Sequence, residues 1–183
     1  MDRATRLFWK SGYAGTSLRD LLKGMGIGES SFYNTHKSKK HAYLECLKHY
    51  NETVNRKRAE AFFIAPTAAL GIRALFKTVL DCLDDPNTPS LVCLMAGSLT
   101  HEVLDEPELR QYVEERMTLL ADAMIARMSA DKQAGVLEEK LDPHLVVPVI
   151  ITYLQGIWRM ALVFYERSRF EGQIDVFLTG LGL

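Results

Sequence analysis

The chain has 183 residues, with 22 Lys and Arg against 23 Asp and Glu, and 48% of it is hydrophobic. This length and mixed charge suit one compact domain or two small ones, and exclude long disordered, collagen-like or mucin-like segments. The longest apolar run, residues 145–151, is far shorter than the roughly 20 residues needed to cross a bilayer. The first residues are charged and precede no signal-type apolar core, so we expect a cytoplasmic protein without membrane contact.

The cysteines and histidines give no metal or disulfide pattern. Cys46, Cys82 and Cys93 are odd in number and lack the paired spacing of a disulfide framework or a zinc site. His101 and His144 have no second ligand at helical spacing. The chain also lacks a nucleophile elbow, a phosphate-cradling glycine loop and an H-E-x-x-H helix. We therefore expect no metal, no cofactor and no enzymatic activity.

Charge is unevenly distributed along the chain. Residues 1–50 carry nine basic and four acidic residues, a net of +5, whereas residues 51–183 carry 13 basic and 19 acidic residues, a net of −6. A basic head on an acidic body favours a polyanionic partner for the head. Chance segregation of surface charge gives the same totals, so charge alone does not decide.

Helical periodicity extends along almost the whole chain and alternating strand patterns are absent, so the sequence predicts an all-α fold. In the basic head, Gly12 ends a first helix, and Ser17 with Asp20 forms a capping-box variant ahead of a second. Glycines separate the second helix from a third, and Ser38 caps a long fourth. The predicted helices of the head cover residues 2–11, 18–23, 29–35 and 39–64.

The acidic body has the start and stop signals of a helical bundle. Pro66 suits the first turn of one helix, residues 84–89 form a loop by composition, and Asp142 caps a helix that begins at Pro143. Pro148 lies inside that helix, where we expect a kink or a later start. The predicted helices of the body cover residues 67–83, 90–104, 107–130, 143–167 and 172 to the C-terminus.

The second and third helices of the head, joined by a turn that contains glycine, fit a helix-turn-helix motif. Leu21, Ile27 and Phe32 can bury together and fix the angle between the two helices. The polar residues of the third helix then face outward, towards a groove of DNA. A generic helical hairpin has the same spacing, so the pattern favours DNA binding without requiring it.

Residues 36–41 place cations around the first turn of the long helix, where the helix dipole prefers anions. This arrangement makes sense where a DNA phosphate accepts backbone N–H bonds at the helix start and is neutralised by lysine. A solvated charged turn is the alternative.

The head also resembles the N-terminal domain of TetR-type (tetracycline-repressor-like) transcriptional regulators, over about residues 1–50. Four spaced motifs agree in order: Leu7-Phe8, Gly12-Tyr13-x-x-Thr16-Ser17-Leu18-Arg19-Asp20-Leu21, Gly26-Ile27-Gly28-x-x-Ser31-Phe32-Tyr33 and Ser38-Lys39. The resemblance implies a three-helix helix-turn-helix DNA-binding domain at residues 1–46. It also implies a C-terminal helical bundle for effector binding and dimerisation at residues 47–183.

The resemblance assigns DNA-binding roles residue by residue. Thr16, Ser17, Tyr33 and Lys39 would meet backbone phosphates, and the polar residues of the third helix would form the recognition surface. The full set of expected DNA contacts is Thr16, Ser17, Glu29, Ser30, Ser31, Tyr33, Asn34, Lys37, Lys39 and Lys40.

Three residues depart from the family pattern. His36 stands where the family usually has Phe, which calls the usual packing between the recognition helix and the long helix into question. Thr35 replaces a frequent His or Tyr, and Lys40 replaces a usual Glu and adds a phosphate contact. Glu29 is acidic at a groove-facing position, so it either reads a cytosine amino group or forms an internal ion pair, and we favour the ion pair.

In the body, large and adaptable apolar residues are candidates for an effector pocket, although such residues more often form a core. No Lys or Arg lies within four residues of Cys93, so we expect an inert buried cysteine rather than a sensor thiol. The expected pocket residues are Phe63, Phe76, Cys93, Met117, Leu120, Met124, Tyr153 and Trp158.

Residues 146–165 are apolar nearly all round, which predicts that one face of this segment packs against a second subunit. The family resemblance implies a four-helix interface made by the last two helices of each subunit. The expected interface residues are Leu154, Tyr165 and Phe177.

Together these observations predict a homodimeric, ligand-responsive DNA-binding transcriptional regulator. We expect a repressor that is released from a palindromic double-stranded operator by a small organic effector. The alternative is a helical protein–protein adaptor whose basic head binds an acidic partner and no DNA.

Overall fold

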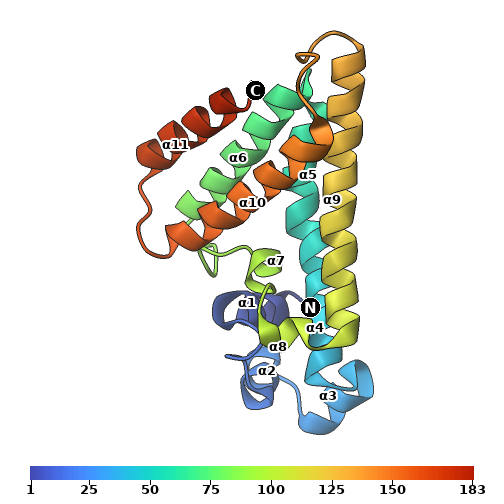
Figure 1. Ribbon diagram of the computed structural model, residues 1–183. Helices are drawn as coiled ribbons and strands as arrows, with labels where there is room; N and C mark the ends of the chain where they lie inside the picture. Colours follow the sequence, from blue (N-terminus) through green and yellow to red (C-terminus); the bar gives the residue numbers. More distant parts are fainter. The chain divides into compact units, whose positions relative to one another are not determined.

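The computed structural model describes residues 1–183, and every regular element in it is a helix (Figure 1). The all-α prediction is therefore confirmed. No helix combines the length and the hydropathy that a membrane span requires. The chain divides into two compact units: unit 1 comprises Met1–Arg56 and Val92–Glu115, and unit 2 comprises Lys57–Leu91 and Arg116–Leu183.

The helices of the amino-terminal part are α1 (Asp2–Ser11), α2 (Leu18–Met25), α3 (Glu29–His36), α4 (Lys39–Tyr50), the π-helix η1 (Asn51–Asn55) and α5 (Arg56–Ile64). They are followed by α6 (Ala68–Asp84), α7 (Leu94–Gly97), α8 (His101–Leu104), α9 (Pro107–Gln133), α10 (Pro143–Ala161) and α11 (Arg167–Gly180). The chain passes from unit 1 into unit 2 at the start of α5 and again within α9.

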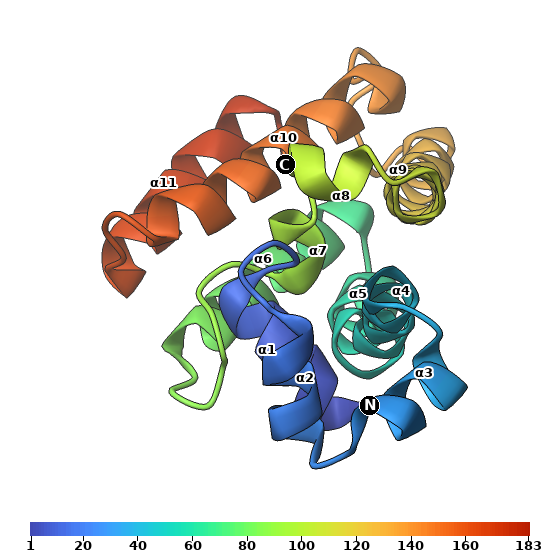
Figure 2. The same ribbon diagram turned by 90° about the horizontal axis from the view of Figure 1, so that it is seen from below.

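Unit 1 is built around α4, against which α1 packs (Figure 2). The ring of Phe8 on α1 meets the ring of Tyr43 on α4 edge to face, with the ring centroids 4.8 Å apart. Both side chains are fully buried, together with Leu21 of α2 and Phe32 of α3. Burial of a large apolar side chain contributes about 1.5–3 kcal/mol. This shared core therefore stabilises short helices that are marginal in isolation.

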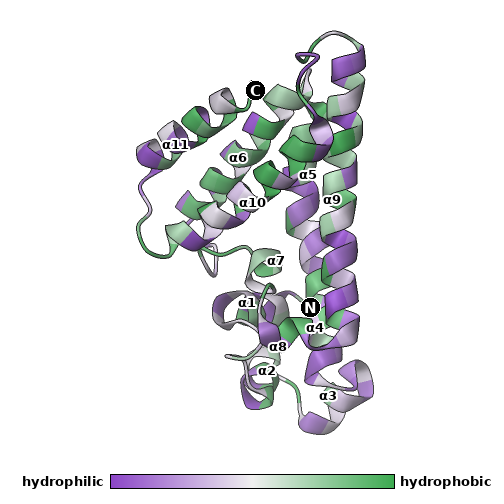
Figure 3. Cartoon of the chain, in the orientation of Figure 1, coloured by the Kyte–Doolittle hydropathy of each residue, from purple (hydrophilic) through white to green (hydrophobic).

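Unit 2 has α6 in its core, and both α6 and α10 are mostly hydrophobic along their length (Figure 3). Ile72 and Phe76 of α6 are buried. Gly71 permits a close approach between α5 and α6, because a Cβ atom there would lie 2.5 Å from the carbonyl oxygen of Phe62. The absence of a side chain at this position lets the two helices pack.

Helix α9 stabilises the turn between α5 and α6 through hydrogen bonds. The guanidinium group of Arg127 donates hydrogen bonds to the carbonyl oxygens of Phe63 and Ala65. The carboxylate of Asp131 accepts a hydrogen bond from the backbone N–H of Ala68, with an N to O distance of 2.5 Å. These bonds satisfy backbone groups that the turn leaves unpaired.

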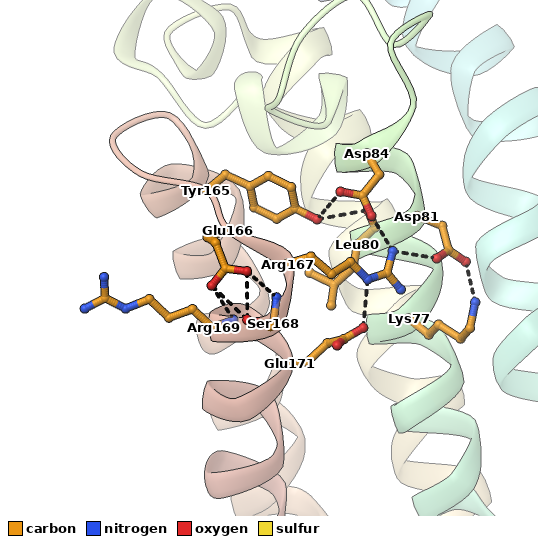
Figure 4. Close-up of polar contacts among 10 residues, drawn as sticks. All are labelled: Lys77, Leu80, Asp81, Asp84, Tyr165, Glu166, Arg167, Ser168, Arg169 and Glu171. Atoms are coloured by element: carbon orange, nitrogen blue, oxygen red, sulfur yellow. Dashed lines mark hydrogen bonds and ion pairs between the residues drawn. The ribbon is translucent and has the colours of Figure 1, made fainter.

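A polar network joins the end of α6 to the start of α11 (Figure 4). Arg167 lies at its centre and pairs with Asp81 at 2.9 Å, with Glu171 at 2.7 Å and with Asp84. The hydroxyl of Tyr165 donates to Asp84 at 2.8 Å. The hydrogen bond from Arg167, helped by that of Tyr165, holds the pKa of the Asp84 carboxyl below its ordinary value.

Three predicted helices of the body were wrong in extent. The segment 90–104 forms α7 and α8 rather than one helix. The hydroxyl of Ser98 bonds back to the carbonyl of Leu94, and Thr100 is extended, so the backbone leaves the helical path between them.

The predicted helix 143–167 ends at Ala161, and the last helix begins at Arg167 instead of Gly172. The cause is an unrecognised cap: the carboxylate of Glu166 accepts hydrogen bonds from the backbone N–H groups of Ser168 and Arg169, at 2.9 and 3.0 Å. In the head, by contrast, α1, α2 and α3 agree with the predicted helices to within two residues at each end.

Candidate DNA-binding surface

The turn between α2 and α3 has the capping and glycine geometry expected from the sequence. The hydroxyl of Ser17 accepts the backbone N–H of Asp20 at 3.1 Å, and the Asp20 carboxylate accepts the backbone N–H of Ser17 at 3.0 Å. The hydrogen bonds from Ser17 lower the pKa of the Asp20 carboxyl. Helix α2 ends at Gly26, whose φ of 71° lies in the left-handed region, and Gly28 precedes α3.

Helix α3 turns its polar residues outward, as the motif predicts. Phe32 is fully buried, whereas the ring of Tyr33 is 45% exposed and meets Phe32 edge-on. The exposed residues of this face are Glu29, Ser30, Ser31, Tyr33 and Asn34. The five recognition-helix candidates therefore lie on one accessible surface.

The favoured ion pair of Glu29 is absent, and that expectation was wrong. Its side chain is exposed in the first turn of α3 and has no cationic partner. The positive end of the helix dipole stabilises a carboxylate at this place without any ion pair. Glu29 is thus available to a ligand in front of α3.

His36 restores the packing that its substitution for Phe called into question. The imidazole is 5% exposed, and its centroid lies 5.2 Å from that of Phe32. Its Nδ1 atom is 2.5 Å from Oε2 of Glu45 on α4, and the other carboxylate oxygen of Glu45 is 3.6 Å from Nε2 of His41. The aromatic contact is kept, and a polar link between α3 and α4 is added to it.

Lys37 makes the sharp reversal between α3 and α4. Its φ of 60° is the only positive φ of a non-glycine residue in the chain. Such a sparsely populated backbone conformation costs about 1–3 kcal/mol for a residue with a Cβ atom. The side chain of Lys37 is exposed beside the outward face of α3.

Thr16 does not offer its side chain to a phosphate. It is 1% exposed, and its hydroxyl donates a hydrogen bond to the carbonyl of Gly12 at 2.7 Å. Its hydroxyl therefore stabilises the turn after α1 and does not point outward, contrary to the expected side-chain contact with a phosphate. The neighbouring Ser17 remains exposed at the start of α2.

Two adjacent lysines at the start of α4 have different surroundings. The ammonium group of Lys39 lies 4.5 Å from the centre of the Tyr13 ring, and partial burial lowers the pKa of Lys39. The ammonium group of Lys40 lies 3.3 Å from Glu106 and 3.8 Å from Glu108, and the hydrogen bond to Glu106 raises its pKa. Lys40 is therefore engaged in internal ion pairs, in place of the phosphate contact expected for it.

Residues 92–115 pack with the head, which the sequence did not indicate. The indole N–H of Trp9 donates to the carbonyl of Val92 at 2.7 Å, and the hydroxyls of Tyr43 and Ser98 lie 2.8 Å apart. The Tyr50 hydroxyl donates to Sγ of Cys93 at 3.3 Å. Tyr43 and Tyr50 are seven residues apart and so share one face of α4, where buried hydroxyls require partners.

The expected effector residues are divided between the two units. Cys93 is buried in unit 1, whereas the other seven lie in unit 2. Of these seven, Phe76, Met124 and Trp158 are buried, Phe63 is 51% exposed, and the others are half-buried. The guanidinium of the buried Arg58 lies 5.1 Å from the centre of the Trp158 ring.

A separate groove of about 120 Å³ lies between α6 and α11. Phe76 is the one expected pocket residue that lines it. Its other lining residues are Arg73, Lys77, Leu80, Glu171, Ile174 and Asp175.

The three expected dimer residues make contacts within their own subunit, where Leu154 is buried and Tyr165 and Phe177 are half-buried. Leu154 is 7% exposed, Tyr165 donates to Asp84, and the ring of Phe177 stacks on that of Tyr153 with centroids 3.8 Å apart. Other apolar residues of α10, α11 and the turn between them are exposed. They are Leu145, Val149, Met160, Leu162, Val163, Phe164 and Val176.

The short helices α2 and α3, the glycine turn between them and the exposed polar face of α3 define a helix-turn-helix DNA-binding protein. Residues 1–46 match the family model for bacterial regulatory proteins of the tetR family. Residues 1–46 therefore form a DNA-binding domain of the TetR type, the family of transcriptional regulators that this model describes.

Relatives and solved structures agree with this assignment over nearly the whole chain. The uncharacterized HTH-type transcriptional regulator YezE of Bacillus subtilis is 29% identical over 99% of this chain and 93% of its own length. The HTH-type transcriptional repressor ComR of Escherichia coli is 23% identical over 100% of this chain and 86% of its own. The TetR family regulator CifR, a cysteine mutant solved with 26-base-pair operator DNA, is 25% identical with a TM-score of 0.87, covering 97% of this chain and 93% of that one.

Proposed function

We propose that the chain acts as a homodimeric transcriptional repressor that binds a palindromic operator and leaves it when a small organic effector binds. The observation that carries the proposal is the exposed polar face of α3 beside Lys39, whose ammonium lies on an aromatic ring and has no carboxylate partner. Polar groups that face bases and a cation that meets phosphate are the two components of sequence-specific recognition. The proposed role is regulatory rather than enzymatic, and it places the protein in the cytoplasm.

Two relatives support the DNA-binding part and the repressor part of this proposal. CifR was solved on operator DNA, and ComR is named as a repressor. For this chain we assign DNA binding to residues 1–46, and effector binding and dimerisation to residues 47–183. The DNA backbone phosphates would be contacted by Ser17, Tyr33, Lys37 and Lys39. The bases would be contacted by Ser30 and Asn34.

We place the dimer interface on the outer faces of α10 and α11. Leu145, Val149 and Met160 recur at the spacing of one helix face, and all three are exposed. Val163 and Val176 are each 76% exposed. A two-fold pair would supply two recognition helices about 34–36 Å apart, which matches successive major grooves.

We place the effector beside Trp158 and Met124 in unit 2. Trp158 and Met124 are buried and apolar, so we expect an effector whose apolar part packs against them. The effector would release DNA by stabilising a form of the dimer that does not fit both half-sites. A Trp9→Phe variant leaves Trp158 as the single tryptophan whose fluorescence reports binding in a screen of small organic molecules.

The experiment that tests DNA binding is selection of duplexes from a random pool, followed by affinity measurements over a salt series. A repressor is expected to enrich a palindrome and to lose about 10³-fold or more in affinity between about 50 and about 200 mM salt. Failure to enrich any sequence, with tight binding to acidic proteins instead, would favour the adaptor. A random-pool duplex bound as tightly as the enriched one would contradict sequence-specific regulation.

A further inference from the structure

The first two residues of α4 are lysines whose partners differ in kind. Lys39 rests on the face of the Tyr13 ring, which leaves its ammonium N–H groups able to donate to a phosphate. Lys40 is held instead by Glu106 and Glu108, at 3.3 and 3.8 Å. All five residues belong to unit 1. One lysine is therefore ready for DNA, and the other already has anionic partners.

The ion pairs of Lys40 are of a kind that DNA can displace. The side chains of Lys40, Glu106 and Glu108 are 34%, 38% and 62% exposed. Exposed ion pairs are weak because water and salt screen them. A duplex offers a phosphate with a condensed counterion layer, which gives a competing site of higher charge density.

The two carboxylates have their own reason to stay at this place. Glu106 and Glu108 flank Pro107, the first residue of α9, where the positive end of the helix dipole favours anions. The Glu106 carboxylate is also close enough to Tyr13 to raise the pKa of its hydroxyl, after the larger effect of burial. The pair therefore persists beside the start of α4 whether or not Lys40 is engaged.

We propose that Glu106 and Glu108 compete with DNA phosphate for Lys40, and thereby lower the affinity of the head for DNA. This inference rests on the proposed DNA-binding function. Lys40 can neutralise a DNA phosphate, and so release counterions from the DNA, only when its ammonium group leaves the two carboxylates. Because Glu106 directly precedes α9, Glu108 lies in its first turn, and the chain continues along α9 into unit 2, effector binding in unit 2 has a covalent route to the competing pair.

The test compares the full-length protein with the double variant Glu106→Gln/Glu108→Gln, on a labelled mixed-sequence duplex across a salt series. The double variant is expected to bind about threefold to tenfold more tightly at low salt and to steepen the logarithmic salt slope by about 0.9, the increment for one more phosphate contact. The matched control is Glu114→Gln/Glu115→Gln, which makes the same charge change on exposed residues of the same helix. It is expected to change affinity less than about twofold, without a change of slope.

Repeating the Glu106→Gln/Glu108→Gln changes in a Lys40→Gln protein distinguishes competition for Lys40 from general electrostatics. There the Glu106→Gln/Glu108→Gln changes are expected to give no gain, since the contested cation is gone. An equal gain with and without Lys40, or an equal gain in the Glu114/Glu115 control, would overturn the competition and leave only general electrostatics. A wild-type protein that binds no duplex even at low salt would instead overturn the proposed function itself.

Discussion

The Nδ1 atom of His36 lies 2.5 Å from Oε2 of Glu45, and this contact joins the last residue of the recognition helix α3 to α4. The imidazole is buried against Phe32, whereas Glu45 is about one-third exposed. The orientation of α3 therefore depends on a polar bond as well as on apolar packing. A buried ring nitrogen left without a partner would carry the full penalty of its lost hydration.

We expect Glu45→Ala to lower the free energy of unfolding by about 1–3 kcal/mol, because it leaves His36 buried and unpaired. Glu45→Gln keeps an acceptor within reach and should lose much less. The double variant His36→Phe/Glu45→Ala removes both polar partners and should recover most of the stability. Urea denaturation of the four proteins checks this order. Equal stability of Glu45→Ala and wild type would contradict a positioning role for the contact.

The head was predictable from the sequence because its signals are local. The capping box of Ser17 and Asp20, and the glycines between α2 and α3, fix helix ends within a few residues of themselves. The exposed face of α3 follows directly from the burial of Phe32 and His36 at helical spacing.

The contacts around α4 were not predictable because they join distant residues. The hydrogen bond between Tyr43 and Ser98 spans 55 residues, and the pairing of Lys40 with Glu106 has no signature in either segment alone. In the same way, Leu154 and Val149 are equally apolar, and only the packed structure shows that Leu154 is buried in its own subunit. Periodicity indicates that a face is apolar, but it does not indicate which neighbour covers it.

Replacement of Lys39 tests the phosphate contact. Lys39→Ala should weaken binding to all duplexes alike and flatten the logarithmic salt slope by about 0.9, as expected for one lost phosphate. Lys48→Ala is the control, because it removes the same charge from an exposed position near the other end of α4. Anisotropy titrations across a salt series measure both quantities. The assignment of Lys39 is wrong if its variant and the Lys48 variant have the same slope.

Alanine substitutions at two helical glycines distinguish the effect of helix propensity on stability from the effect of helix packing. Gly71→Ala would place a Cβ atom 2.5 Å from the backbone carbonyl of Phe62, so we expect a loss of about 1–3 kcal/mol in the free energy of unfolding. Gly24→Ala meets the end of the flexible Leu7 side chain instead, which can rotate away. The gain of about 1 kcal/mol in helix propensity should then nearly offset the crowding. Thermal denaturation that ranks the Gly24 variant below the Gly71 variant would contradict this reading.

The polar network around Arg167 predicts a dependence of stability on pH. The pKa of Asp84 is lowered from its ordinary value of 3.8, chiefly by the hydrogen bond from Arg167. Its stabilising effect is therefore complete above that value and is lost as the pH falls through the lower pKa of the folded state. Arg167→Met should reduce stability by about 1 kcal/mol at neutral pH, the size expected for exposed ion pairs. Urea denaturation should show the difference between the two proteins shrinking towards about pH 3. A constant difference would mean that Arg167 acts through packing alone.

The dimer interface is tested on residues that the folded subunit leaves exposed. Leu154→Glu would bury a charge within the subunit and unfold it, so it does not distinguish folding from assembly. Val149→Glu on α10 and Val176→Glu on α11 introduce charges at surface positions, so each subunit should keep its thermal stability to within about 1 kcal/mol. Carboxylates brought together on a two-fold interface lose hydration and repel each other, and both variants should therefore sediment as monomers at micromolar concentration. A monomer presents one recognition helix in place of two, so its affinity for a palindrome should fall by about 10²-fold or more.

Val136→Glu, an exposed substitution in the loop between α9 and α10, is the control and should remain dimeric. Val149→Glu and Val176→Glu proteins that sediment as dimers would place the interface elsewhere, and a wild-type monomer would remove it altogether.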